Sequence, residues 1–159
     1  MKNRLNFLFM MLLTAATSSF AEIRTVASSS DIAAIVREIG GEDIDVATIA
    51  KGKANLHFVE VLPSYMLKVS KADIYFKIGL AMDQWADDII AGSRNGKLLV
   101  VDCSTGIEVL ERPTGKVDAS MGDVHTEGNP HYWLDPRNGK VIARNILDGL
   151  SQVDPGNRS

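Results

Sequence analysis

Apolar positions along the chain alternate between two spacings up to residue 101. Four segments have the alternating or continuous apolar patterns of strands: 24–27, 44–49, 72–78 and 98–101. Between them, three segments place apolar residues three and four positions apart, as a helix with one buried face does: 32–39, 63–69 and 82–89. Strands that alternate with helices predict an α/β fold, a three-layer α/β/α lobe with a mostly parallel four-stranded sheet. The run at 98–101 is apolar throughout, so we expect both faces of that strand to be covered.

The regular pattern fades after the fourth strand and returns near the end of the chain. Residues 104–129 are rich in Gly, Thr, Asp and Pro, and they form a predicted loop of roughly twice the length at which structureless connections become uncommon. Loops of this kind are usually functional or disordered. Asp135 then precedes Pro136, a pair typical of a helix N-cap and first turn, and a last helix is predicted over 142–150.

The first 21 residues have the features of a secretory signal. Lys2 and Arg4 form a short basic start, residues 5–13 are almost entirely apolar, and Ser19-Phe20-Ala21 offers small residues at a cleavage site. The apolar run is shorter than the roughly 18 residues that a membrane anchor needs. We therefore predict a cleaved signal peptide at 1–21 and export, most simply to a periplasm. No cysteine stands at the junction to carry a lipid.

The composition and charge of the chain exclude some partners and bonds. The 159 residues include 17 Lys and Arg against 20 Asp and Glu, a net charge of -3. No excess of positive charge is available to neutralise phosphates, so nucleic acid is not an expected partner. The single cysteine, Cys103, cannot form a disulfide within the chain. Residues 92–97 resemble a phosphate loop only superficially, because they precede a strand, and Ser28, Ser29 and Ser30 are expected to cap a helix.

Three histidines are the residues best suited to chemistry: His57, His125 and His131. His57 follows the second predicted strand and His131 follows the fourth. Because ligands of parallel sheets bind beyond the carboxyl ends of the strands, both histidines can reach the same edge. Neutral imidazole is the commonest transition-metal ligand and suits zinc. Spacing alone leaves an ordinary surface or core histidine as the alternative for each.

Two longer segments carry a family resemblance. One is Gly-Asn-Pro-His-Tyr-Trp-Leu-Asp-Pro at 128–136, and the other is His-Phe-Val-Glu-Val-Leu-Pro-Ser at 57–64. They resemble the solute-binding proteins of zinc and manganese ABC transporters, in which an NPH-x-WLDP segment presents a metal-binding histidine. Residues 72–79 and Trp85 are similar to the following strand and helix of that family. The resemblance covers residues 22–157.

The resemblance implies both an architecture and a function. Family members have two α/β lobes joined by a long helix, whereas this chain has the length of one lobe. Residues 22–159 are therefore expected to be the N-terminal metal-binding lobe, without the second lobe and its ligands. The implied function is a non-enzymatic periplasmic carrier that captures Zn(II), or Mn(II), and delivers it to the membrane permease of an ABC importer. Of the metal ligands, His57 and His131 would come from this chain.

The chain also departs from the family pattern. Asn55-Leu56 stands where members commonly have Asp-Pro, which changes the rigidity of the loop but leaves the histidine. Zinc importers often have a long His-rich loop where residues 115–129 contain one histidine. Because a closed zinc site needs four ligands, the chain would need substitutes for those of the absent lobe. The candidates are His125, Glu60 and Cys103.

Two alternatives to a working carrier stay open. A truncated, non-transporting fragment accepts the same family assignment. In either case the absent lobe predicts an exposed apolar face on the last helix and hence self-association. A zinc-dependent hydrolase would need a third protein ligand and a general base beside an open metal position. No HExxH motif is present, which disfavours that reading.

Overall fold

The computed structural model describes residues 22–115 and 125–157. Its strands are β1 (Ile23–Ser29), β2 (Ile44–Ala50), β3 (Ile74–Lys77) and β4 (Leu99–Asp102). Its α-helices are α1 (Ser30–Gly40), α2 (Pro63–Val69), α3 (Trp85–Ser93) and α4 (Gly139–Val153). Short 3-10 turns lie at Gly41–Asp43, Tyr132–Leu134, Pro136–Asn138 and Pro155–Asn157. Strands and helices alternate as predicted up to β4, and α4 follows the long connection.

The strands form one sheet in the order β2-β1-β3-β4. Every pairing in it is parallel; Val26 of β1, for example, pairs with Ala47 of β2 on one side and with Tyr75 of β3 on the other. The chain therefore runs outward from β1 to β2, crosses back to β3 and continues outward to β4. This arrangement confirms the predicted parallel four-stranded sheet.

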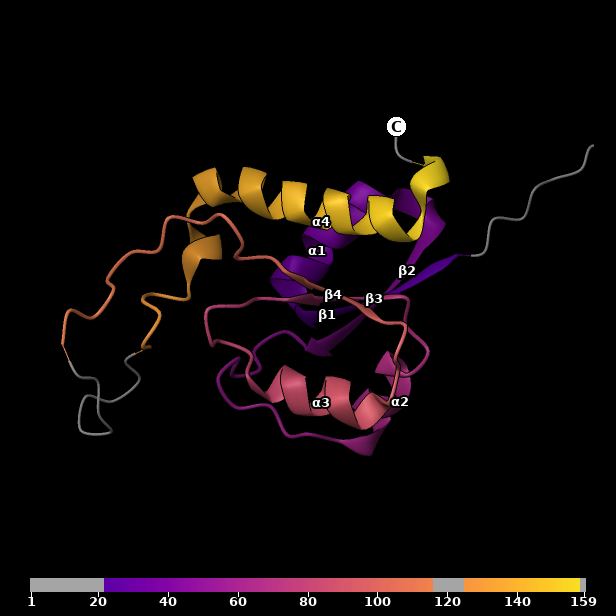
Figure 1. Ribbon diagram of the computed structural model, residues 1–159, viewed down its shortest axis with the longest axis horizontal. Helices are drawn as coiled ribbons and strands as arrows, with labels where there is room; N and C mark the ends of the chain where they lie inside the picture. The colour runs from indigo at the N-terminus through magenta and orange to yellow at the C-terminus, as the bar shows by residue number, and fades with distance from the viewer. Residues whose placement is uncertain (1–21, 116–124, 158–159) are drawn as a thin grey trace, which may run out of the picture.

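Helices cover both faces of the sheet (Figure 1). α1 and α4 lie on one face, over a core that includes Ile32, Val36, Phe76, Ile142 and Ile146. α2 and α3 lie on the other face, over a core that includes Val69, Tyr75, Trp85, Ala86 and Ile89. All these side chains are buried. Because each large apolar side chain contributes roughly 1.5–3 kcal/mol when it is fully buried, the two cores hold the three layers together.

Polar residues begin two of the helical segments as the sequence predicts. The Ser29 hydroxyl accepts a hydrogen bond from the Ile32 amide at 3.3 Å, so one of the three serines, Ser29 at the end of β1, caps α1. The Ser28 hydroxyl instead pairs with the Tyr75 hydroxyl, and the Ser30 hydroxyl accepts from the Gly52 amide. The Asp135 carboxylate accepts one from the Arg137 amide at 2.9 Å. It thereby caps the 3-10 turn that leads into α4.

Two expectations about apolar surfaces are wrong. β4 is an edge strand whose Leu99 and Val101 pack into the α1–α4 core, while Val100 on the opposite face is 42% exposed. An apolar run therefore did not mean that both faces were covered. The last helix does not expose its apolar face either, because the residues on that face pack against the sheet and α1. Leu147, beside that face, is 45% exposed.

Two further predictions concern segments that the structure describes only in part or not at all. The predicted signal peptide at 1–21 and the middle of the long loop, 116–124, lie outside the described residues. Within the described ranges, the loop contains no helix or strand between β4 and Tyr132, as predicted. None of the helices there is both long enough and apolar enough to cross a membrane.

Candidate metal site

The topology places a crevice at the carboxyl ends of the strands. β1 leads into α1 on one face of the sheet, and its neighbour β3 leads into α3 on the other face. Connections that diverge in this way leave room between them, which is where ligands of open parallel sheets bind. The connections after β2 and β4 carry His57 and His131 to this edge.

The structure brings the two predicted histidines together. The ring centroids of His57 and His131 are 5.6 Å apart, although the residues follow strands at opposite edges of the sheet. The ring of His125 stacks on that of His57 with the centroids 4.9 Å apart. All three line one cavity of about 420 Å³, and the remaining lining residues are Glu111, Gly128, Asn129 and Pro130.

The separation of the His57 and His131 rings is close to that of imidazoles that share a metal ion. Zinc–nitrogen bonds of about 2.0 Å in tetrahedral geometry place the centres of two bound rings about 5 Å apart. The donor atoms are not gathered for such an ion in this arrangement: among the described residues, no group of three or more His, Cys, Asp or Glu side chains is placed to hold a metal. The role of His57 and His131 as ligands therefore stays a prediction.

Each of the two histidines ends a local turn of the same type. The backbone amide of His57 donates to the Asn55 side-chain oxygen at 3.0 Å. The backbone amide of His131 likewise donates to the Asn129 side-chain oxygen at 2.9 Å. An asparagine that accepts a hydrogen bond from the amide two residues later forms an Asx turn, which fixes the local direction of the chain. This role of the two asparagines was not predicted, although the pattern Asn-x-His that the two segments share is a signal for it.

Contacts with neighbouring elements hold each segment. The Trp85 indole nitrogen, in α3, donates to the Leu56 carbonyl oxygen at 2.7 Å. On the other side, the Tyr132 hydroxyl donates to the Ile78 carbonyl oxygen at 2.7 Å. Each bond fixes a residue directly beside one of the two histidines.

The electrostatics of the cavity favour neutral imidazole. Partial desolvation of the ring, followed by the charge of the nearby His57, lowers the pKa of His131, although the residue is exposed at the rim of the cavity. The neutral ring is the form that binds metal, so a lowered pKa extends metal binding toward more acidic pH.

The structure separates the three candidate substitute ligands. His125 shares the cavity with His57 and His131, as described above. Glu60 is exposed and lines a different cavity, beside Lys68. Cys103 is fully buried, and that burial, with the charges of nearby acidic residues, raises the pKa of its thiol. A thiol held in its neutral form under the α1–α4 core is not available as a ligand at the cavity.

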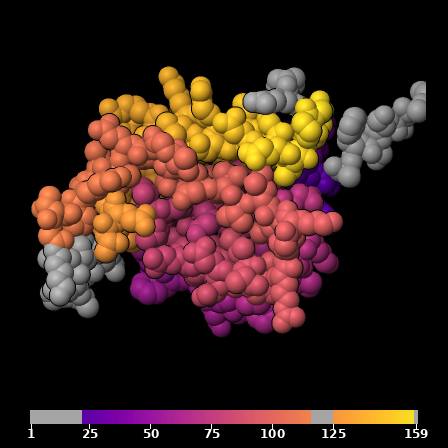
Figure 2. Space-filling model, viewed as in Figure 1, coloured from indigo at the N-terminus to yellow at the C-terminus, as the bar shows by residue number. Residues whose placement is uncertain are grey.

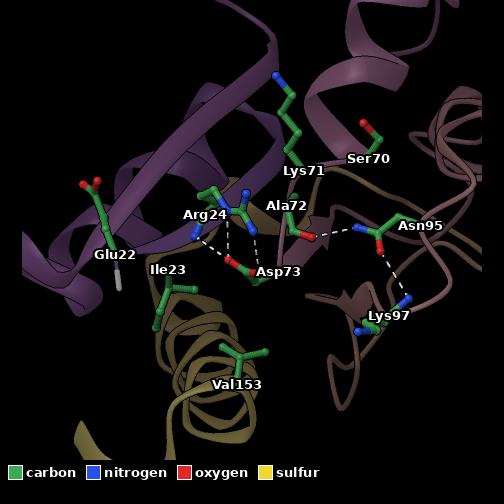
Figure 3. Close-up of a pocket in the computed structure, with 10 residues that line it drawn as sticks. All are labelled: Glu22, Ile23, Arg24, Ser70, Lys71, Ala72, Asp73, Asn95, Lys97 and Val153. Atoms are coloured by element: carbon green, nitrogen blue, oxygen red, sulfur yellow. Dashed lines mark hydrogen bonds and ion pairs between the residues drawn. The ribbon is translucent and has the colours of Figure 1, made fainter. Parts of the chain in front are cut away.

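A larger cavity lies at the other end of the strands, beside their amino ends (Figure 3). Its volume is about 630 Å³, and its lining residues come from the amino ends of the strands and from the end of α4. Figure 3 shows Arg24 turned toward Asp73, and the two form an ion pair at 3.2 Å. No histidine lines this cavity. It is therefore separate from the histidine site.

The sequence matches a protein family described as ZnuA, zinc-uptake complex component A, periplasmic. The match runs over residues 25–159, which is most of the chain. The chain belongs to this family. The resemblance seen in the two histidine segments of this ZnuA-family chain is thereby confirmed.

Relatives of this ZnuA-family chain include named transport proteins. The manganese ABC transporter substrate-binding lipoprotein PsaA of Streptococcus pneumoniae is 30% identical over 153 residues, which cover 89% of this chain and 45% of that protein. A metal ABC transporter substrate-binding lipoprotein of Lactococcus lactis is 31% identical over 144 residues, which cover 86% of this chain and 43% of that protein. The chain thus spans less than half the length of these relatives.

Solved structures confirm the fold of this ZnuA-family chain. The Mn-bound periplasmic metal binding protein from Candidatus Liberibacter asiaticus matches with a TM-score of 0.73 at 20% identity, over 86% of this chain and 47% of that one. The metal-dependent lipoprotein YcdH from Bacillus subtilis matches with a TM-score of 0.70 at 20% identity, over 86% of this chain and 46% of that one. The α/β fold is the one these proteins share.

Proposed function

We propose that this chain is the N-terminal metal-capturing lobe, residues 22–159, of the solute-binding component of a metal ABC importer. His57 and His131 bind the ion, and a membrane permease receives it. The observation that carries the proposal is the meeting of these two imidazoles in one open cavity at the carboxyl edge of the sheet. The names of the relatives, which are substrate-binding proteins of manganese and other metal ABC transporters, support it.

The proposed ion is Zn(II), with Mn(II) as the alternative. Imidazole nitrogen favours zinc, whereas manganese prefers carboxylate and carbonyl oxygen. His125, the third imidazole in the cavity, adds to the nitrogen character of the site. The name of the S. pneumoniae relative favours manganese. Ligands from a second lobe would decide between the two metals, because this lobe contributes only part of the coordination shell.

The proposed location is outside the cytoplasm. The basic and apolar start of the chain supports a cleaved signal peptide at 1–21 and release into a periplasm. The relatives named above are lipoproteins, so attachment by a lipid is the alternative. The proposed self-association is weaker than the sequence implied. The apolar face of α4 is packed against the rest of the protein, and only Leu147 is exposed beside it.

A competition titration tests the proposal. The protein without residues 1–21 is titrated with zinc, and separately with manganese, against a chromophoric chelator. We expect zinc binding in the micromolar range or weaker, about -8 kcal/mol or less favourable, because His57 and His131 fill only two of the four positions of a tetrahedral shell. His57→Ala and His131→Ala should each abolish this binding, and Glu60→Ala, which alters the other cavity, is the matched control.

The outcomes separate the alternatives. Binding that survives both histidine substitutions would show that the site assignment is wrong. Nanomolar 1:1 binding that needs His125 as well would show that the lobe completes a site of its own. Transport assays of the same chain with its permease distinguish a working carrier from a non-transporting fragment, since both bind metal through His57 and His131.

A further inference from the structure

Glu111 lies at the base of the long loop, beside the segment that carries His131. The Asn129 backbone amide donates to the Leu110 carbonyl oxygen at 2.8 Å. The Asn129 side-chain nitrogen donates to the Glu111 carboxylate, also at 2.8 Å. The segments that enter and leave the loop therefore lie side by side. They are the orange traces at the left of Figure 1 and the orange atoms at the left of Figure 2.

The two hydrogen bonds of the Asn129 side chain form a relay. A carboxylate only accepts hydrogen bonds, so Glu111 requires the amide nitrogen of Asn129 to face it. The amide oxygen is then left facing the backbone N–H of His131, which donates to it at 2.9 Å. A hydrogen bond to a charged acceptor is stronger than a neutral one. Glu111 thus sets the orientation of the group that sets the direction of His131.

The backbone on both sides of the relay is held in an uncommon conformation. Glu111 has a φ of +55°, which non-glycine residues seldom adopt, and Gly128 has a φ of +104°. A Cβ atom on Gly128 would lie 2.7 Å from the Leu110 carbonyl oxygen. A glycine adopts a positive φ without strain, but Glu111 does not, and a strained non-glycine residue persists only where the surroundings over-determine it. The close approach of the two segments is therefore maintained against a local cost.

The other histidine has the same turn without the carboxylate. Asn55 accepts from His57 as Asn129 accepts from His131, but within the described residues no carboxylate is hydrogen-bonded to the Asn55 amide nitrogen. Asn55 is also exposed, whereas Asn129 is partly buried. The two turns are therefore a matched pair in which one member has the relay and the other does not.

We infer that Glu111 is a positioning residue that acts through Asn129 to hold His131 at the metal cavity. This inference rests on the proposed function, because its consequence for metal affinity needs His131 to be a ligand. Groups that orient a ligating histidine typically change metal affinity by roughly 10- to 100-fold when they are removed. The expected change in metal affinity is thus large enough to measure in the titration described above.

Substitutions that keep or reverse the polarity of the relay test it in the full chain. Glu111→Ala removes the acceptor, and Asn129→Asp places two carboxylates in contact, so each should weaken zinc binding roughly tenfold. Glu111→Gln keeps an acceptor oxygen and should change affinity by less than about threefold. The double variant Glu111→Gln with Asn129→Asp should recover most of the affinity that Asn129→Asp loses. The glutamine amide then donates to one oxygen of the new aspartate, while the other oxygen of that aspartate still accepts from the His131 amide.

Asn55→Asp is the matched control. An aspartate there accepts the same hydrogen bond from His57, and among the described residues no carboxylate is hydrogen-bonded at that place, so Asn55→Asp should weaken zinc binding by much less than Asn129→Asp does. Thermal unfolding of every variant shows whether the protein is still folded. A loss of affinity in Asn129→Asp at an unchanged melting temperature, with rescue by Glu111→Gln, is a pattern that a merely structural role would not produce.

Amide hydrogen exchange gives a readout that needs no metal. Exchange of the His131 amide should accelerate in Glu111→Ala, while exchange of the His57 amide stays as in the parent protein. Loss of binding in Glu111→Gln with none in Asn129→Asp would identify Glu111 as a direct ligand and overturn the relay. If neither position matters while His57→Ala and His131→Ala abolish binding, the relay is wrong and the proposed function stands. If no histidine matters, the proposed function fails, and unchanged exchange at His131 would reject the relay separately.

Discussion

The two histidine segments use one local device and differ in how the rest of the protein holds it. Each places its histidine two residues after an asparagine that accepts its backbone N–H. The His131 segment is fixed further by the buried Pro130 and by the Glu111 carboxylate. The His57 segment depends on the bond from Trp85 to the Leu56 carbonyl, and it is followed by Phe58, whose side chain is 75% exposed.

The difference shows that the same short pattern is restrained by different contacts in different surroundings. Proline at position 130 restricts the backbone of its own segment, whereas Leu56 at the equivalent place leaves its backbone free. Trp85 supplies from a distant helix the restraint that a proline supplies locally. We therefore expect loss of a tertiary restraint outside the turn to lower mainly stability on the His131 side, where Asn129 and Pro130 still fix the histidine, and mainly metal affinity on the His57 side.

The largest expected effect is that of Gly128→Ala. The new Cβ would lie 2.5 Å from the Val109 side chain and 2.7 Å from the Leu110 carbonyl oxygen, on a backbone with a φ of +104°. Steric overlap and backbone strain together should lower the free energy of unfolding by about 3 kcal/mol or more. Chemical denaturation measures this change.

Gly52→Ala, in the connection that leads to His57, is the matched control for that substitution. Gly52 also has a positive φ, +58°, but nothing lies within 4 Å of the place where its Cβ would be. It should cost only about 1 kcal/mol, the strain of a left-handed residue. Equal costs at the two glycines would contradict the stronger anchoring of the His131 segment.

Trp85→Phe should separate affinity from stability on the His57 side. It removes the indole N–H that donates to the Leu56 carbonyl oxygen while keeping an aromatic ring in the core. Zinc affinity should fall roughly tenfold, because the turn before His57 loses its tertiary restraint. The free energy of unfolding should fall by about 1–2 kcal/mol. Competition titration and denaturation on the same preparation give both values.

Tyr132→Phe is the counterpart on the other side. It removes the hydroxyl that donates to the Ile78 carbonyl oxygen, which should lower the free energy of unfolding by about 1–3 kcal/mol. Zinc affinity should change by less than about threefold, because Asn129 and Pro130 still fix the direction of His131. If Tyr132→Phe weakens binding more than Trp85→Phe does, the two segments are anchored in the reverse order.

The smallest expected effect is on the pH dependence of stability without metal. The pKa of His131 is lowered in the folded protein by partial desolvation and by the charge of His57. The unfolded chain therefore binds the proton more readily, so stability falls as the pH falls through the imidazole range and is constant above the ordinary pKa of about 6.5. His131→Ala should reduce this slope in denaturation curves at pH 5–8. An unchanged slope would show that the ring is not desolvated.

Most of the fold was predictable because it depends on local patterns. The spacing of apolar residues identified all four strands and the helices between them, and Pro63 and Asp135 marked helix starts that the structure confirms. The status of β4 was not predictable in this way. Val100 is apolar in either a central or an edge strand, and only the order of the strands determines whether a helix covers it.

The site was predictable only in part. The positions of His57 and His131 after their strands indicated a common edge, and the rings do lie 5.6 Å apart. Glu111 carried no signal, because nothing in the residues around it marks a partner eighteen positions later. Its contact with Asn129 arises where the long loop closes on itself.

By itself, the sequence determined the alternation of strands and helices, the family and the two histidines presented at one edge. These features follow from backbone periodicity and from contiguous motifs, which act over a few residues. Only the tertiary structure decided which atoms hold each histidine: an indole from α3 for one, a carboxylate across the loop for the other. The reason is physical, since a hydrogen bond between distant segments depends on where the packed core brings them, and no local pattern contains that position.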